Sequence, residues 1–437
     1  MKKCLLLACG LSLICAQEQG DEMRGVFANA GLEMWHKVAL NPASQSLPNN
    51  TYGYTLGEAN MGYKSGNFQA MIGGVGAGLI NDSTKGLSFN HIGFYPGYYN
   101  SRASEVSLNN AHYIFVHNAF IKYEGESVSL SAGRFRQEND DWVDAYVEGV
   151  NARINAGDFY FKIFGTSGIA LVGNGWLMDY NRLFAQQGII SLTSGYEGTN
   201  TKADVYVYYA DREYIAPGFN VELDFGADSH FSSHTKLTAI FPYHYTSIMN
   251  IGKHYFANVG ANNGVLKDIS GWNASVLLRQ DFKFDKAYNI ALAVYKNFGA
   301  ANSRVGQAGN PSGINFLDNS VYTTGPALNA LTTPDAISGL FFSDIKISNP
   351  TKYTEEINFG LNLRYTSAPS ALEYSALLHI DLHLNKATIF GVVAGYYIHT
   401  MKDGGLVGIS PANFTFANGD SLRLDRSYIT TRLSVGF

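Results

Sequence analysis

Apolar and polar side chains alternate at every second position along several segments of this chain. In 355–366, apolar residues alternate with Glu356, Asn358, Asn362, Arg364 and Thr366. In 373–385, His379, Asp381 and His383 share the polar face. Because successive side chains of a strand point to opposite faces, each segment predicts a strand with one apolar and one polar face. Similar patterns occupy 272–285, 388–400 and 427–437.

These segments are about ten residues long, the length that a tilted strand needs to cross a bilayer. Strands of soluble sandwiches are nearer five or six residues. Two stretches, 113–123 and 203–211, are apolar on both faces, so their inward and outward sides stay unassigned.

The connections between the predicted strands are of two kinds. Some are short, such as 124–126 and 367–370, and others are long and rich in Gly, Asn, Pro and Ser, such as 81–110, 246–271 and 299–334. This asymmetry is typical of outer-membrane barrels. At roughly 23 residues per strand and its share of loop, the chain predicts 16–18 strands around an aqueous lumen. The expected fold is all-β, a transmembrane antiparallel barrel of about 18 strands with short periplasmic turns and long extracellular loops.

Composition agrees with this class without deciding it. The 437 residues include 46 Gly, 28 Tyr and 27 Phe but only 15% charged residues, and the mean hydropathy is −0.08. A barrel whose lipid face uses every second residue has such an average, and Tyr and Phe form its interfacial girdles. A secreted soluble all-β enzyme or lectin would also be rich in Gly and Tyr, so that alternative stays open.

The first sixteen residues predict a secretory signal. Lys2 and Lys3 precede an uncharged, Leu-rich run that ends at Ala16, a small residue suited to cleavage. The expected organisation is a signal over 1–16 and a single barrel domain over 17–437. All three cysteines, Cys4, Cys9 and Cys15, lie in the signal, so the mature chain has no thiol chemistry. Removing the signal changes the formal charge from −5 to −7, which argues against a nucleic-acid partner.

Two segments carry a family resemblance. The closing alternation, with Leu433, Val435 and the terminal Phe437, resembles the C-terminal signature of bacterial outer-membrane barrels. The resemblance implies recognition of this strand by the barrel-assembly machinery. The hairpin 117–135, which ends in Gly133–Arg134 and precedes Asp140–Asp141–Trp142, resembles OprD-type porins and the related Helicobacter and Campylobacter porins. That family implies an 18-stranded monomeric or trimeric channel for small hydrophilic solutes.

OprD-type channels guide carboxylate substrates with a row of Arg and Lys in the lumen. The pore-lining and selectivity candidates here are Arg134, Arg136, Arg153, Arg279, Asp281, Lys283, Glu356, Arg364, His379, Asp381, His383 and Arg432. Because acids stand among the bases, the mixture argues against strict selectivity for anions.

Motifs for other chemistry are few. His379, Asp381 and His383 resemble zinc ligands, but spacings of about 7 Å along one strand are long for a shared ion, so a water-facing wall is the favoured interpretation. The glycine run 73–78 lacks the features of a phosphate loop, and no hydrolase or zinc-protease motif occurs. We therefore expect no enzyme activity, no metal and no cofactor.

The function predicted is a passive porin of the bacterial outer membrane, in contact with outer-membrane lipid. A barrel-based adhesin or receptor that binds through its long loops is the alternative. The loops 81–110 and 299–334 are the candidates for folding inward to narrow the pore.

Overall fold

The computed structural model describes residues 24–41, 51–83, 92–94, 111–138, 140–182, 188–226, 230–245, 271–285, 287–299, 305, 309–314, 330–332, 335–351, 353–369, 371–402, 406–407, 415–416 and 421–437. The predicted signal, residues 1–16, lies outside this part of the chain. No helix among the described residues is long and apolar enough to cross a membrane.

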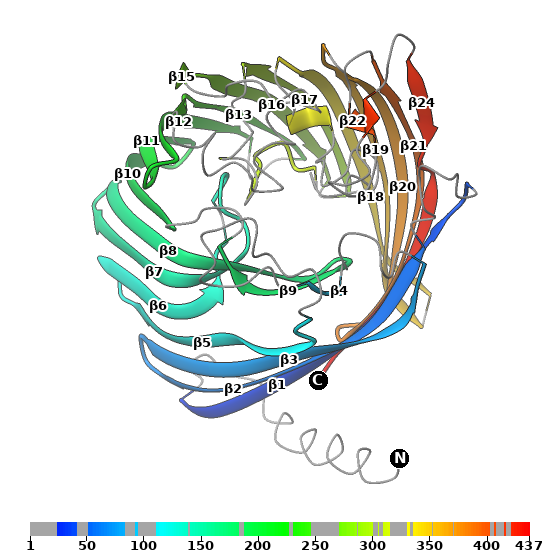
Figure 1. The fold of residues 1–437 in the computed structure, drawn as a ribbon. Coiled ribbons are helices and arrows are strands. Elements are labelled where there is room, and N and C mark those ends of the chain that lie inside the picture. The colour runs from blue at the N-terminus through cyan, green and yellow to red at the C-terminus, as the bar shows by residue number, and fades with distance from the viewer. Residues whose placement is uncertain are drawn as a thin grey trace, which may run out of the picture.

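Eighteen long antiparallel strands form the wall of a closed barrel (Figure 1). They are β1 Gly25–Ala39, β2 Tyr52–Ser65, β3 Phe68–Asp82, β5 Ile114–Glu124, β6 Val128–Arg136, β7 Tyr146–Ala156, β8 Phe159–Gly173, β10 Ile189–Glu197, β11 Thr201–Ala210, β12 Tyr214–Phe225, β13 Phe231–Ile240, β16 Ala274–Phe284, β17 Tyr288–Phe298, β18 Ile337–Thr351, β19 Thr354–Ser367, β20 Ala371–Asn385, β21 Thr388–Met401 and β25 Tyr428–Gly436. The predicted fold class and strand number are confirmed.

Shorter elements extend the wall or lie apart from it. β14 Tyr243–His244, β15 Gly271–Trp272 and β24 Leu422–Asp425 continue the ladders at one rim, and β22 Leu406–Val407 pairs with β23 Thr415–Phe416. β4 Ile92–Phe94 and β9 Trp176–Asn181 lie inside the ring of strands (Figure 1), and η3 Ala330–Thr332 is a single 3₁₀ turn.

The barrel closes where the two ends of the chain meet. β1 pairs with β25 from Gly31 opposite Gly436 to Ala39 opposite Tyr428. The amide of Phe437 donates to the carbonyl of Ala30 at 2.8 Å, so the terminal residue belongs to the closing ladder. Leu433 and Val435 stand opposite Met34 and Leu32, which are exposed on the apolar outer face.

Tight turns join the strands at one rim. Gly66–Asn67 connects β2 to β3, and Gly157–Asp158 connects β7 to β8. Gly66 and Gly157 have φ values of +54° and +62°, a region that glycine adopts without steric cost. Because neighbouring strands are antiparallel, the strand ends that lead into the long connections lie at the opposite rim, as the sequence predicts.

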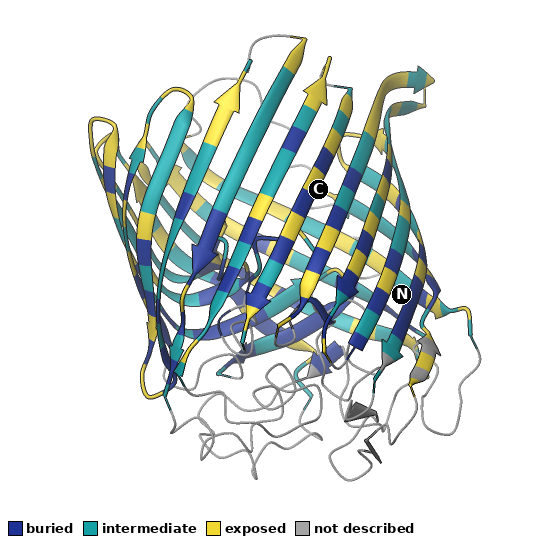
Figure 2. Ribbon diagram, turned by 90° about the horizontal axis from the view of Figure 1, so that it is seen from above, coloured by how far each residue is buried: buried dark blue, intermediate teal, exposed yellow. Residues whose placement is uncertain are grey.

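The alternation in the sequence reappears as alternation in burial (Figure 2). In β19, Leu361, Leu363 and Tyr365 are 36–47% exposed, whereas Arg364 and Thr366 are buried. In water such an apolar surface would be unfavourable, so the outer face suits a hydrocarbon environment.

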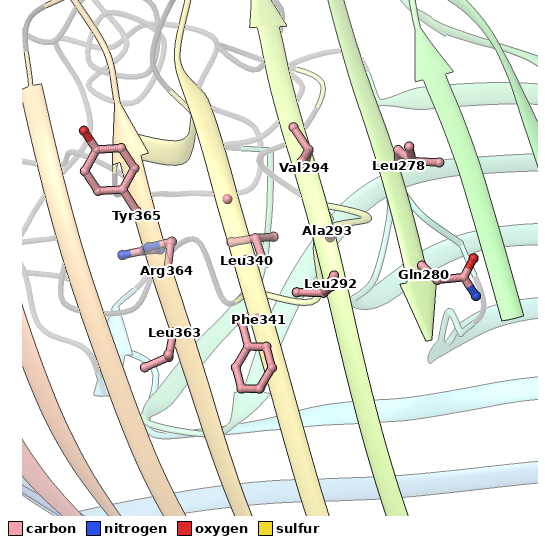
Figure 3. Close-up of a pocket in the computed structure, with 11 residues that line it drawn as sticks. Leu278, Gln280, Leu292, Ala293, Val294, Leu340, Phe341, Leu363, Arg364 and Tyr365 are labelled. Carbon is pink, nitrogen blue, oxygen red and sulfur yellow. The ribbon is translucent and has the colours of Figure 1, made fainter. Parts of the chain in front are cut away.

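A shallow groove of about 640 Å³ crosses the outer face of β16–β19 (Figure 3). Its exposed walls include Leu278, Leu292, Val294 and Leu363, and Gly339 contributes no side chain to fill it. The groove therefore belongs to the apolar outer surface and not to the barrel interior.

We expect neighbouring residues of β19 to respond oppositely to a charge. Leu361→Arg places a cation on the outer face near the middle of the strand, where it should lower the free energy of unfolding in a bilayer by about 2–4 kcal/mol. Asn362→Arg is the matched control on the inner face and should change it little. Urea titration of the heat-modifiable gel band in lipid vesicles measures both, and equal losses would contradict the assignment of faces.

Candidate functional site in the barrel interior

The register of the ladders fixes which side chains face the interior, because directly opposed residues project from the same face. From β13 to β25, opposed positions place Arg279, Asp281, Lys283, Glu356, Arg364, His379, Asp381, His383 and Arg432 on one face. This is the face opposite to the exposed apolar residues. Arg153 of β7 lies on the same inner face through its pairing with Lys162 and the ladders that follow.

Charged side chains on the later strands pair with neighbours of opposite sign. Arg279 donates two hydrogen bonds to Asp281, each 2.8 Å long, and Arg432 lies 3.3 Å from Asp381. Glu356 forms an ion pair with Lys346. Lys283 is exposed and has no ion pair among the described residues. This wall therefore presents both signs of charge, with Lys283 as an exposed cation.

Arg364 belongs to a buried group at the far end of β19–β21. Its guanidinium lies 3.4 Å from the Glu373 carboxylate, which also accepts a 2.5 Å hydrogen bond from the Tyr397 hydroxyl. His399 lies 3.5 Å from the same carboxylate. Since these side chains are buried, the cluster has a structural role in the wall.

The three residues with metal-like spacing bind separate partners. His379 contacts Asp344 at 3.1 Å, Asp381 contacts Arg432, and His383 contacts Asn358 at 3.2 Å. Across the described residues, no group of three or more His, Asp or Glu side chains could hold a metal ion.

Arg134 and Arg136 contact segments inside the barrel, whereas Arg153 contacts the wall. Arg134 pairs with Glu148 at 2.8 Å and lies over the ring of Tyr180 in β9 at 4.5 Å. Arg136 contacts Asp144 at 2.5 Å. Arg153 contacts Glu197 at 2.6 Å and stacks on Tyr160, so all three candidate arginines have local partners.

The inner strands β4 and β9 cover an apolar part of the wall. They pair in parallel, and the Tyr180 hydroxyl donates to the carbonyl of His117 at 2.7 Å. Ile92, Leu177 and Tyr180 pack in one buried cluster with wall residues Tyr54, Leu56, Val75, Phe115 and Ala170. This contact narrows the interior beside β2, β3 and β5.

A second segment inside the barrel is the loop between β6 and β7, which we call the inner loop (residues 137–145, of which Asn139 is not described). Trp142 and Val143 are buried against Phe164, Tyr206 and Tyr208 of the wall. The loop has four carboxylates, Glu138, Asp140, Asp141 and Asp144. Burial raises the pKa of the Asp141 carboxyl, and the adjacent Lys236 ammonium opposes this shift.

Two parts of the long connection 299–336 also lie against these elements. Val305 joins the buried cluster around Trp142, and Leu331 of η3 packs on Leu277 and Leu340. In segment 309–314, the Asn310 amide donates to the Tyr295 hydroxyl at 3.4 Å. The inward-folding loops therefore include described residues of both candidates, 81–110 and 299–334.

Reasoning from the sequence missed the inner loop and β9 as inward segments. The sequence feature that could have predicted them is the presence of two stretches, 113–123 and 203–211, that are apolar on both faces. In 113–123 the inner residue Phe115 packs against Tyr180 of β9, and in 203–211 the inner residues Tyr206 and Tyr208 contact the inner loop. A wall segment that is apolar on its inner face thus marks the place where a loop covers it.

A polar cavity of about 1050 Å³ remains between the inner loop, segment 309–314 and the wall from β5 to β13. Acidic side chains outnumber basic ones in its lining, and Tyr160 and Asn220 add polar groups. The charged residues of the lining are Glu124, Glu138, Asp140, Asp141, Asp144, Glu197, Asp204, Glu222, Arg153, Lys162, Lys202 and Lys236. Such a space suits water and hydrophilic solutes.

Known structures share this architecture. OccAB4 of Acinetobacter baumannii has a TM-score of 0.61 at 10% sequence identity, covering 95% of this chain and 99% of that one. OccK8 (OprE) of Pseudomonas aeruginosa has a TM-score of 0.62 at 9% identity, covering 94% and 98%. OpdK of Pseudomonas aeruginosa, determined with vanillate, has a TM-score of 0.55 at 10% identity, covering 94% and 98%. At these identities the likeness establishes the barrel fold.

No curated protein matches the chain at a significant level. A family model described as "Putative outer membrane protein" matches residues 13–437, nearly the whole chain. This match agrees with the apolar outer face and places the protein in the bacterial outer membrane. The chain belongs to this family of outer-membrane proteins.

Proposed function

We propose that the protein is a porin, a passive diffusion channel for small hydrophilic solutes. The observation that carries the proposal is the contrast between the two faces of the wall: apolar side chains outside, and charged groups of both signs inside around a polar cavity. Solutes would exchange part of their hydration for contacts with these lumen groups, and the charges would set selectivity. The likeness to Occ and Opr channels supports this function.

The inner-face candidates would form the selectivity surface. Their pairing in the structure leaves these candidates with little charge preference of their own, because Arg279, Glu356 and Arg432 are each next to an opposite charge. The similar barrel OpdK was determined with vanillate, a carboxylate. Carboxylates are therefore among the first solutes to test, although the mixed lining argues against a strict preference for them.

We extend the proposal to assembly and processing. The signal 1–16 would be removed on export, the remaining chain would form one barrel domain, and the barrel-assembly machinery would recognise the strand that ends in Leu433, Val435 and Phe437. The resemblance of the 117–135 hairpin supports kinship with Helicobacter and Campylobacter porins and allows a homotrimer. The channel would act without catalysis.

Purified protein in a planar bilayer should give stepwise increases in conductance, because each inserted barrel adds one water-filled path. Heat-modifiable migration in a detergent gel verifies that the sample is folded. A folded sample that inserts without conductance steps would refute the channel and favour an adhesin or receptor.

Lys283→Gln should shift ion selectivity toward cations, since Lys283 is an exposed cation on the inner face without an ion pair among the described residues. The measurement is the reversal potential across a KCl gradient near 0.1 M, where the Debye length is about 10 Å. Lys386→Gln, in the exposed turn between β20 and β21, makes the same charge change outside the lumen and should leave the potential unchanged. Equal shifts in both variants would exclude a lumen effect.

Deleting Phe437 should slow assembly, because its backbone hydrogen bonds to Ala30 complete the closing ladder. The readout is the fraction of membrane-associated protein with heat-modifiable migration. Phe437→Tyr keeps the backbone and an aromatic side chain, so it should assemble normally. Normal assembly of the deletion variant would argue against a role for the terminal residue.

A further inference from the structure

We propose that Lys162 and Lys236 set the size limit of the pore by holding the inner loop against the wall, and are positioning residues rather than solute guides. The inference rests on the proposed channel function. Both lysines lie on the inner face and line the polar cavity, where a cation would ordinarily be assigned to attracting anions. Their contacts indicate a different role.

The first attachment is at Asp140. Its carboxylate lies 3.2 Å from the Lys162 ammonium of β8 and accepts a 2.6 Å hydrogen bond from the Tyr208 hydroxyl of β11. The same carboxylate accepts hydrogen bonds from the backbone amides of Trp142 and Val143, each 3.1 Å long. One nearly buried side chain therefore fixes both the shape of the loop and its distance from the wall.

The second attachment is at Asp141 and reaches a more distant strand of the wall. The Lys236 ammonium of β13 lies 2.6 Å from its carboxylate and 3.5 Å from Glu222. Between the two ion pairs, the Trp142 indole donates to the Tyr206 hydroxyl at 2.9 Å. The inner loop is thus held at points on β8, β11 and β13.

The opposite side of the loop is covered by segment 309–314. A Cβ atom at Gly309 would lie 2.8 Å from the backbone of Trp142, Val143 and Asp144, closer than real contacts allow. Only a residue without a side chain permits this approach. The inner loop is therefore enclosed between the wall and a second loop, and it can leave this position only if the ion pairs break.

Two other inner-face lysines differ in this respect. Lys64 and Lys283 are exposed and have no ion pair among the described residues. A paired ammonium next to a buried carboxylate is neutralised locally, so it contributes less to the field that a solute meets. Lys162 and Lys236 form ion pairs with the inner loop, whereas Lys64 and Lys283 are accessible to solutes.

The test uses two substitutions that break one ion pair with opposite changes of charge. Lys236→Met removes a cation and Asp141→Asn removes an anion, so their electrostatic effects on ions should be opposite. If the pair positions the loop, both variants should admit larger solutes. Liposome swelling with neutral saccharides of graded size should show a severalfold faster uptake of the largest sugar in both variants. The double variant should take up the largest sugar at about the same rate as either single variant, because the two residues act through one contact.

Lys64→Met is the matched control, since it removes one cation from the inner face without touching the inner loop. It should keep the wild-type size limit. An unchanged size limit in Lys236→Met and Asp141→Asn, with ion selectivity moving in opposite directions, would overturn the proposal. Heat-modifiable migration verifies that each variant is folded.

A second readout does not depend on transport. The chain's cysteines all lie in the predicted signal, so Val143→Cys would introduce a single thiol into the mature protein at a position that is 1% exposed. Modification by a hydrophilic maleimide should be slow in this background and severalfold faster when Lys236→Met is added. Unchanged labelling would refute the role of the ion pair. If wild-type protein failed to conduct but labelling increased, the channel function alone would be rejected.

Discussion

The hydrogen-bond ladder between β1 and β25 is the constraint on which the rest of the structure depends. In hydrocarbon, each unpaired backbone amide or carbonyl costs several kcal/mol, so a sheet can span a membrane only when its edge strands pair with each other. Here the first and last strands share a register over nine residue pairs, and the terminal Phe437 extends it to Ala30. Closure leaves the sheet with an inside and an outside, and the alternation of side chains becomes a difference between two environments.

The inner face carries both charged and apolar side chains, and each kind is accommodated differently. Along β16–β25, charged groups are balanced by nearby groups of opposite sign, as in the pair of Arg279 with Asp281 on β16 and the pair of Arg432 on β25 with Asp381 on β20. On β2, β3 and β5, the part of the inner face around Tyr54, Val75 and Phe115 is apolar and is covered by β4 and β9. The interior therefore contains both a polar path and a packed region, and their boundary lies near Arg134, which contacts Glu148 and the ring of Tyr180.

The inner loop connects these features to transport. Its carboxylates contact lysines of β8 and β13, its Trp142 contacts Tyr206 of β11, and Gly309 covers the side that faces away from the wall. The desolvation of buried ion pairs offsets much of their attraction, so their net contribution to stability is small. The role that we propose for these pairs is the choice of one position of the loop. In this barrel that choice fixes how much of the interior stays open.

The sequence by itself determined the wall. The alternation of side chains along a strand is a local property, so the patterns in 355–366 and 373–385 predicted the inner and outer faces of β19 and β20 correctly. The lengths of the strands and loops predicted the number of strands. Only the tertiary structure decided which loops enter the interior. The contacts that hold the inner loop join residues 22 and 95 positions apart, Lys162 with Asp140 and Lys236 with Asp141, and no local pattern encodes such a pairing. The segments that are apolar on both faces became interpretable only when β9 and the inner loop were seen to cover them, because burial depends on neighbours that are distant in sequence.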